Sequence, residues 1–296
     1  MSDDAPASPL QHETRLDDGL RMAWFEWPAA PARVGAPTIL LVHATGFHAR
    51  CWDAVVERLD GHRVVAVEMR GHGRSEKTDP VPWDRFGEDL ASFVRAEGLE
   101  DAVGVGHSMG GYCVTCAAAT VPGAFSRLVL VDPVILPPEA YRARAQWMDG
   151  DEHPTAKRRD AWRDWEEMYA RFEDRMPFAA WEPRVLRDYC RHGVLPAPAG
   201  EGFVLACPPR IEASIYVGSA GRDIYALVEQ VDVPVTVLRA RNRAEDRDVM
   251  DFSASPTWPH LAERFPDARD VHLADRSHFI PMEDPALTAE FILGTR

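Results

Sequence analysis

Positive charge is scarce in this chain. Its 296 residues include 33 Lys and Arg against 47 Asp and Glu, which gives a formal net charge of −14. Nucleic acids and anionic membrane surfaces attract proteins through basic patches, so we expect neither of them as a partner. The net charge carries no information about the substrate, because the charge inside a site can differ from that of the whole surface.

Long hydrophobic runs are also missing. No apolar segment approaches the roughly 20 residues that a membrane-spanning helix needs. The first residues, Met1–Pro6, are acidic and lack the apolar stretch of a secretion signal. Because 46% of the residues are hydrophobic, the chain has enough apolar material for a substantial core. We therefore expect a cytoplasmic protein with such a core.

The chain has few cysteines, and their spacing matches no disulfide framework. The five cysteines are an odd number without disulfide spacing, which is typical of reduced thiols in a cytosolic protein. Cys113 and Cys116 form a C-x-x-C pair, a spacing that redox and metal sites use. No second pair accompanies them and they lie in an apolar run, so we interpret them as core residues.

Cofactor motifs are absent as well. The sequence contains no H-E-x-x-H and no paired metal-ligand spacing. Its glycines lack the G-x-G-x-x-G spacing that brings a backbone close to a pyrophosphate. We therefore expect neither a metal nor another cofactor.

The sequence does contain an alternation of strand and helix patterns. Apolar runs typical of buried strands alternate with segments whose apolar residues recur at helical spacing, which implies parallel strands joined by crossover helices. A hairpin with Asp17-Asp18-Gly19 as its turn comes first, after a loose leader of residues 1–12. The predicted strands are 13–16, 20–27, 38–42, 63–67, 102–106, 127–131, 233–238 and 269–273. The predicted helices are 51–59, 83–97, 111–119 and 285–293, with one more between the last two strands.

The alternation breaks after Asp132. From about residue 137 to 223 no long β-branched run appears, while aromatic residues recur at helical spacing. These aromatic residues include Trp147, Trp162, Trp165, Tyr169, Phe172 and Trp181. We interpret residues 134–225 as a mostly helical insertion in a core of residues 1–133 and 226–296.

Gly106-His107-Ser108-Met109-Gly110 stands between a predicted strand and a predicted helix. A serine at such a turn sits on a tight bend, which the glycines permit without steric clash. The bend lifts the Ser108 hydroxyl clear of the sheet and frees the Met109 backbone N–H to face developing negative charge. We predict a nucleophile elbow, with Ser108 as nucleophile, Met109 as an oxyanion donor, and His107 packed beneath the turn.

A serine hydroxyl needs a base to take its proton, and histidine titrates in the useful range. Among the eleven histidines, His278 has the right position. It follows the last predicted strand, so its loop opens at the same end of a parallel sheet as Ser108. A second oxyanion donor is expected from the loop after the first parallel strand, where Thr45 is the first choice. His43 is expected to brace this loop through hydrogen bonds.

Four motifs occur in the order seen in the α/β-hydrolase superfamily. They are His43-Ala44-Thr45-Gly46, Glu68-x-Arg70-Gly71-His72-Gly73-x-Ser75, Gly106-x-Ser108-x-Gly110 and Ser277-His278. The chain therefore resembles a member of this superfamily with a serine nucleophile. The resemblance implies an α/β fold with a mostly parallel eight-stranded sheet, helices on both faces, and a helical cap inserted after the sixth strand. It also implies a structural role for the stretch Arg70–Gly73, in the loop after the fourth strand.

The resemblance leaves two positions open for the triad acid. Members of the family usually carry an aspartate shortly after the seventh strand, but here arginines follow that strand, and the carboxylates, among them Asp246, come later. Other members carry the acid at the end of the sixth strand, where this chain has Asp132. A strand-end residue followed by Pro133 is held more rigidly than one in a charged loop, which favours Asp132 over Asp246. The competing interpretation makes Asp132 a hinge residue that only accepts backbone hydrogen bonds.

Together these residues favour a serine hydrolase. We expect it to act on a small-molecule substrate, a largely apolar ester, thioester, lactone or related carbonyl compound, through an acyl-enzyme on Ser108. Serine at the elbow argues against haloalkane dehalogenases and epoxide hydrolases, because those relatives use aspartate there. A carbon–carbon bond hydrolase, an acyltransferase or a cofactor-free haloperoxidase on the same triad is an alternative. A non-catalytic ligand-binding protein on this fold is another.

Overall fold

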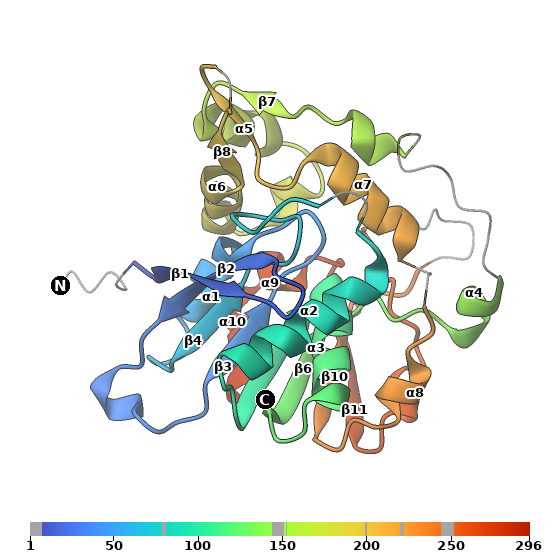
Figure 1. The fold of residues 1–296 in the computed structure, drawn as a ribbon. Coiled ribbons are helices and arrows are strands. Elements are labelled where there is room, and N and C mark those ends of the chain that lie inside the picture. Colours follow the sequence, from blue (N-terminus) through green and yellow to red (C-terminus); the bar gives the residue numbers. More distant parts are fainter. Residues whose placement is uncertain are drawn as a thin grey trace.

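A computed structural model describes residues 8–78, 81–143, 151, 153–198, 200–219, 222–243 and 252–296. Its centre is an eight-stranded sheet with the strand order β1-β2-β4-β3-β5-β6-β10-β11 (Figure 1). The pairs β1–β2 and β2–β4 are antiparallel, and all other neighbours are parallel. The expected mostly parallel sheet of eight strands is confirmed.

The register of the central strands places their ends level with one another. Val42 pairs with both Val67 and Gly106, and His107 pairs with Val131. The loops that follow these strands therefore meet at one edge of the sheet. The strands are β1 (Leu10–Arg15), β2 (Arg21–Trp27), β3 (Ile39–Val42), β4 (Val64–Val67), β5 (Ala102–His107), β6 (Phe125–Val131), β10 (Val235–Arg239) and β11 (Ala268–His272).

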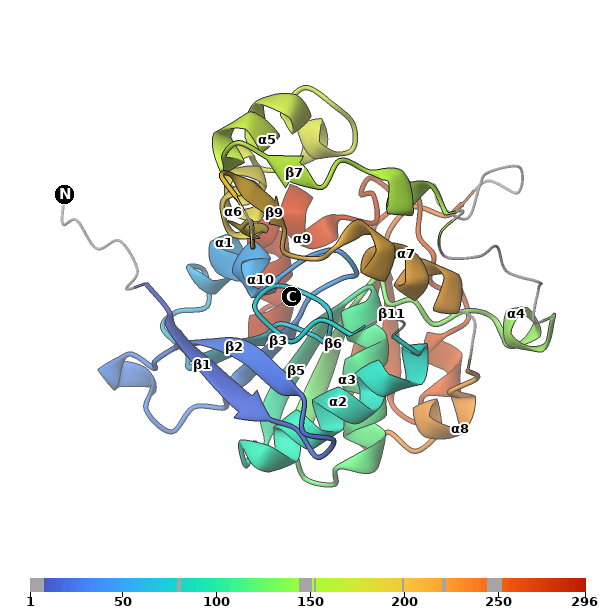
Figure 2. The ribbon, with the colours of Figure 1, turned by 45° about the horizontal axis from the view of Figure 1, so that its top comes forward.

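Helices cover both faces of this sheet, as expected (Figures 1 and 2). Successive strand residues point to opposite faces, so one strand supplies both layers. Leu40 and Val42 pack into the first layer, and their neighbours Ile39 and Leu41 pack into the second. The first layer contains α2 (Trp83–Ala96), α3 (Met109–Thr120) and α8 (Tyr225–Val228), and the second contains α1 (Asp53–Val56) and α10 (Pro285–Leu293).

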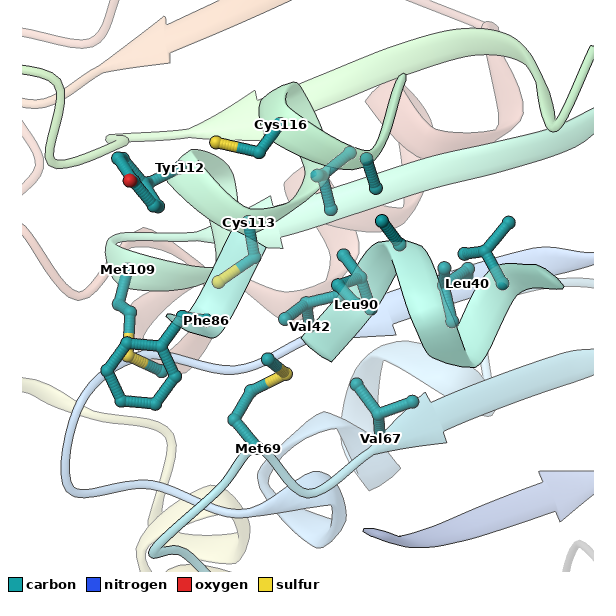
Figure 3. Packing of buried hydrophobic residues seen from close by; sticks show 14 of the residues in the cluster. Leu40, Val42, Val67, Met69, Phe86, Leu90, Met109, Tyr112, Cys113 and Cys116 are labelled. Carbon is teal, nitrogen blue, oxygen red and sulfur yellow. The ribbon is translucent and has the colours of Figure 1, made fainter. Parts of the chain in front are cut away.

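Helix α3 is buried along most of its length, and its cysteines belong to the core (Figure 3). Cys113 and Cys116 lie in the same hydrophobic cluster as Phe86 and Leu90. Burial raises the pKa of Cys116 to about 12 and that of Cys113 well above its usual value. Both thiols therefore stay protonated, a state that suits packing rather than redox chemistry or metal binding.

The described segments between β6 and β10 that lie over the carboxyl ends of the parallel strands are called the cap below (Figure 1). The bounds of the cap, residues 134–225, stay a prediction. Phe47, which follows β3, packs against Trp181 and Tyr189 of the cap. The helices of the cap include α4 (Pro138–Ala143), α5 (Trp165–Phe172), α6 (Pro183–His192) and α7 (Pro209–Gly218). It also contains a three-stranded antiparallel sheet of β7 (Ala161–Trp162), β9 (Phe203–Leu205) and β8 (Val194–Pro196) (Figure 2). The sequence pattern gives no sign of this sheet, because its strands are two or three residues long.

Three further local predictions are wrong. Part of the leader belongs to β1, because backbone pairing with β2 orders an edge strand that has no apolar pattern. The helix predicted for residues 51–59 is a 3-10 turn, Ala49–Trp52, followed by the single turn of α1. Between β10 and β11, residues 252–267 form only the short 3-10 helix Ala262–Arg264, since three prolines interrupt this stretch. Residues 244–251 lie outside the described part.

None of the described helices is long and apolar enough to cross a membrane.

Candidate active site

Ser108 occupies the turn between β5 and α3 in a strained conformation. Its φ of +56° lies in the left-handed region, which residues with a side chain rarely adopt. The flanking glycines allow the close packing of this turn. A Cβ on Gly106 would lie 2.2 Å from the Gly110 carbonyl oxygen, and a Cβ on Gly110 would lie 2.2 Å from that of Val42. The turn therefore fixes the serine at the carboxyl edge of the sheet, where it keeps 6% of its accessible surface.

Ser108, His278 and Asp132 meet at this edge. His278 Nε2 lies 3.0 Å from Ser108 Oγ, and His278 Nδ1 lies 2.6 Å from Asp132 Oδ2. Asp132 follows β6, and His278 lies between β11 and α9 (Ile280–Glu283). With a proton on Nδ1 donated to the carboxylate, Nε2 is free to accept the serine proton. This order of hydroxyl, imidazole and carboxylate is the one that nucleophilic serine chemistry needs.

The second oxygen of Asp132 is held by a distant part of the chain. Asp132 has a φ of +46°, and its own N–H donates to the Leu238 carbonyl at 2.7 Å. Three donors converge on its Oδ1: the backbone N–H of Ala240 at 3.0 Å, the Ser255 hydroxyl, and the Thr257 hydroxyl at 3.3 Å. These contacts fix the orientation of the carboxylate. No sequence signal links Ser255 and Thr257 to Asp132, because only the folded chain brings them together.

Of the two acids considered from the sequence, the structure describes only Asp132, because Asp246 lies outside the described residues. Asp132 accepts backbone and hydroxyl hydrogen bonds through Oδ1, as a hinge residue would, but its Oδ2 contacts the His278 ring. The hinge interpretation therefore accounts for only one of its two oxygens.

The predicted oxyanion donors lie on two segments that touch. Met109 is the first residue of α3, so its N–H has no carbonyl partner one turn earlier in the helix. Thr45 is buried in the loop after β3. The close approach of Gly110 to Val42 brings this loop against the start of α3.

Two neutral histidines hold the Thr45 loop. The Gly46 N–H donates to His72 Nε2 at 3.0 Å, and the Met69 N–H donates to His43 Nε2 at 3.0 Å. Burial lowers the pKa of His43 to about 4 and that of His72 well below its usual value. A neutral imidazole keeps an acceptor nitrogen, which both N–H groups require. The brace expected at His43 and the structural role expected for the stretch Arg70–Gly73 have this geometric basis.

His107 links the serine turn to the loop that carries the base. It is fully buried, and its Nε2 lies 2.9 Å from the His278 backbone oxygen. Burial lowers the pKa of His107 well below its usual value, so the ring is neutral and donates this bond. The residue before Ser108 thus helps to position the loop of His278.

A cavity of about 610 Å³ lies between the cap and the core. Half of the residues that line it are aromatic, and two of these contact the His278 ring. The ring centroids of Phe252 and Phe279 lie 5.8 and 5.7 Å from that of His278. Neither Ser108 nor His278 is among the described residues that line the cavity, so Phe252 and Phe279 connect its wall with the candidate site. The aromatic residues are Phe47, Trp162, Phe172, Phe178, Trp181, Tyr189, Tyr216, Phe252 and Phe279.

Three potential metal ligands gather elsewhere, between α1 and α6. One ligand atom each of Asp53, Asp188 and His192 lies within 4.8 Å of the others. Arg50 already forms an ion pair with Asp53 at 2.5 Å, so a cation is present at this carboxylate. Residues of the triad take no part in the cluster.

The fold defines a class of protein, the α/β hydrolases. The chain belongs to the alpha/beta hydrolase family, which it matches over residues 39–291. It is 31% identical over 281 residues to Lipase LipV of Mycobacterium tuberculosis, an alignment that covers 91% of this chain and 96% of that protein.

Two further proteins illustrate the range of similar chains. A pimeloyl-[acyl-carrier protein] methyl ester esterase of Pectobacterium atrosepticum is 32% identical over 111 residues, which cover 37% of this chain and 41% of the esterase. The solved structure of E-2-(acetamidomethylene)succinate hydrolase is similar in fold, with a TM-score of 0.72 and 19% identity over 97% of this chain and 98% of that one. With lipase and esterase relatives, the chain is an esterase-like hydrolase.

Proposed function

We propose that this protein is a serine hydrolase that cleaves a small, largely apolar ester, thioester, lactone or related carbonyl compound. Ser108, His278 and Asp132 form its catalytic triad, and the N–H groups of Met109 and Thr45 form its oxyanion hole. The observation that carries the proposal is the hydrogen-bonded series from Ser108 Oγ through the His278 ring to Asp132 Oδ2, with separations of 3.0 and 2.6 Å.

The reaction proceeds through an acyl-enzyme. Ser108 Oγ attacks the carbonyl carbon while its proton moves to His278 Nε2, and the new oxyanion accepts hydrogen bonds from Met109 and Thr45. Collapse of this tetrahedral intermediate expels the alcohol, which takes the proton from His278, and leaves the acyl group on Ser108. A water molecule then attacks the acyl group, again with His278 as the base, and releases the acid and free Ser108.

The surroundings of the triad support an apolar substrate. Half of the residues that line the cavity between cap and core are aromatic. Such a wall removes apolar substrate surface from water without offering many competing hydrogen bonds. The cap of residues 134–225 and the core of residues 1–133 and 226–296 are the two domains of the proposal. Five free, buried cysteines support a cytoplasmic location.

Labelling with a fluorophosphonate probe tests the nucleophile. The folded protein is expected to form one adduct, mapped to Ser108 by mass spectrometry, and to hydrolyse p-nitrophenyl butyrate. Ser108→Ala is expected to lose both the adduct and the turnover. Ser126→Ala is the matched control, since Ser126 lies at an exposed position of β6 and its hydroxyl donates to the backbone oxygens of residues 101 and 102, away from Ser108.

A folded protein that gives no adduct and no turnover would favour the alternative of a non-catalytic binding protein. An adduct on Ser108 together with transfer of the butyryl group to an added alcohol, in preference to water, would assign the site to an acyltransferase.

A further inference from the structure

Unpaired cations line the exposed part of the cavity. Lys157, Arg171 and Arg175 contribute to its wall and are exposed, and none of them forms an ion pair within the described part of the chain. A fourth cation, Arg159, is already paired with Glu167 at 2.7 Å. Three uncompensated positive charges on one cavity wall stand out in a chain whose net charge is −14.

A continuous series of aromatic rings connects these cations with the triad. The ring of Phe279 contacts His278, and the Phe279 and Trp181 centroids lie 5.1 Å apart. Trp181 then contacts Phe178 at 4.9 Å, and Phe178 stacks on Phe172 at 4.4 Å. Phe172 and Arg171 line the same cavity. An apolar chain that starts at Ser108 and follows this wall therefore leads to the part of the cavity that the cations line.

The inner part of the cavity contains a carboxylate and no unpaired cation among the described residues. Glu212 is buried, and a Cβ placed on Gly46 would lie 2.5 Å from its Oε1, so the carboxylate borders the Thr45 loop. Arg158 Nη1 neutralises this carboxylate at 2.5 Å. The cation of this pair is already occupied, so the pair offers a second anion no unpaired positive charge. A negative group of a substrate is therefore favoured only at the outer end.

We propose that the cavity binds an acyl group that lies along the aromatic wall and ends in an anionic group, a carboxylate or a phosphate, held by Lys157, Arg171 and Arg175. The proposal rests on the proposed esterase function and names its substrate class. Guanidinium groups bind carboxylates and phosphates through the same paired N–H donors. Because the acyl group stays attached to Ser108, this distant contact acts in both halves of the reaction and contributes to transition-state binding.

Three p-nitrophenyl esters of equal chain length test the proposal. The first carries a terminal carboxylate (mono-p-nitrophenyl suberate), the second a terminal phosphonate, and the third the methyl ester of the carboxylate. We expect kcat/KM of one anionic ester to exceed that of the neutral ester by about ten-fold, because several exposed charge contacts each contribute modestly. Whichever anionic ester is preferred identifies the native anion as a carboxylate or a phosphate.

Variants that remove one positive charge show which residues cause the preference for anionic esters. Arg171→Gln and Arg175→Gln are each expected to lower kcat/KM for the preferred anionic ester by about two- to five-fold and to leave the neutral ester unchanged. Arg187→Gln is the matched control, since Arg187 is an exposed arginine of α6 that does not line the cavity. It removes the same charge from the cap and is expected to change neither ester.

The outcomes separate this inference from the proposed function. Equal kcat/KM for neutral and anionic esters, or an equal loss in Arg187→Gln, would overturn the anion site and leave the esterase function intact. A second readout does not depend on turnover, namely quenching of tryptophan fluorescence by free suberate, compared with dimethyl suberate. Suberate binding that weakens in Arg171→Gln, in a protein that cleaves no ester, would support the anion site and refute the proposed function. Absence of both binding and turnover would refute both.

Discussion

Asp132 connects the candidate chemistry with distant parts of the chain. One of its oxygens contacts His278, while the other accepts hydrogen bonds from residues that follow β10. Its left-handed backbone conformation is a strained one, and such strain persists only where the surroundings hold it. A carboxylate held this way keeps the imidazole in one tautomer and one orientation.

Replacing this carboxylate tests its role. Asp132→Asn is expected to lower kcat for p-nitrophenyl butyrate by about 10³- to 10⁴-fold, because an amide no longer stabilises the protonated imidazole. Asp246→Asn is the comparison and is expected to retain near wild-type turnover. Circular dichroism checks that both variants fold. Retained activity in Asp132→Asn, with loss in Asp246→Asn, would assign the triad acid to Asp246.

Among single residues, the sequence best predicted the positions of those that follow the end of a strand. Ser108 and His278 could be paired in advance, because parallel strands bring their carboxyl ends to one edge. Ser255, Thr257 and the Arg158–Glu212 pair could not be anticipated. Their contacts are made across elements far apart in the sequence, and no local pattern records such contacts.

Among the elements, α6 carries an acidic group in an unfavourable position. Asp188 lies on α6 close to Asp53, at the start of α1, and its nearest cation is Arg184, whose Nε is 3.8 Å away. Its Oδ2 accepts no hydrogen bond from the part of the chain that the structure describes. Burial, and then the charge of Asp53, raises the pKa of Asp188 to about 6.

This shift makes the stability of the protein depend on pH. The native state binds the Asp188 proton more tightly than the unfolded state, whose aspartates have a pKa of about 3.9. The contribution of Asp188 to stability therefore falls as the pH rises from about 4 through 6. Asp188→Asn is expected to remove this fall and to raise the free energy of unfolding at pH 7 by about 1 kcal/mol, after allowance for solvent screening.

Urea unfolding at pH 4.5, 5.5 and 7 measures the effect as a difference between the variant and the wild type. Asp174→Asn removes an exposed aspartate of the cap and serves as the control. A difference that does not change with pH would contradict the assignment to Asp188.

Predictability also differed among the elements. The central strands were found because they are continuous apolar runs, and α2 and α10 because their apolar and capping patterns are long enough to recognise. The first half of the edge strand β1, the short strands of the cap and the 3-10 turns were not predicted. Backbone pairing and tertiary packing decide such short segments, and two or three residues hold too little pattern to show it.

For the whole molecule, the contact between cap and core is concentrated around Trp181. Its ring packs against Phe47 and Phe279 of the core and against Phe178 of the cap. The following residue adds a backbone bond, from the Glu182 N–H to the Met282 carbonyl at 2.9 Å. Within the described residues the indole N–H of Trp181 has no hydrogen-bond partner, so its contribution is one of packing.

Two substitutions at Trp181 separate packing from hydrogen bonding. Trp181→Ala is expected to lower the free energy of unfolding by about 3 kcal/mol and to raise KM for esters, because it opens a cavity between cap and core. Trp181→Phe keeps an aromatic ring and loses no hydrogen bond, so most of the stability is expected to remain. Urea unfolding and ester kinetics measure both. Equal losses in the two variants would show that the indole contributes something other than packing.

The overall architecture was predicted from the order of the motifs, whereas single strands and helices were predicted from local patterns. The alternation of strands and helices indicated a parallel sheet, but the order of strands in it cannot be read from the strands themselves. The expectation of eight strands came from four short motifs and their order along the chain. The local pattern predicted an insertion after β6, while the way this segment packs over the core depends on aromatic contacts that no sequence period encodes.

The contacts of Asp132 have a consequence for the synthesis of the protein. The residues that hold this carboxylate follow β10, and the imidazole that it contacts follows β11. A growing chain therefore lacks the imidazole or the groups that orient the acid. On the proposed triad, Ser108 becomes reactive only after synthesis has passed His278. Measured hydrolysis would then count finished molecules alone.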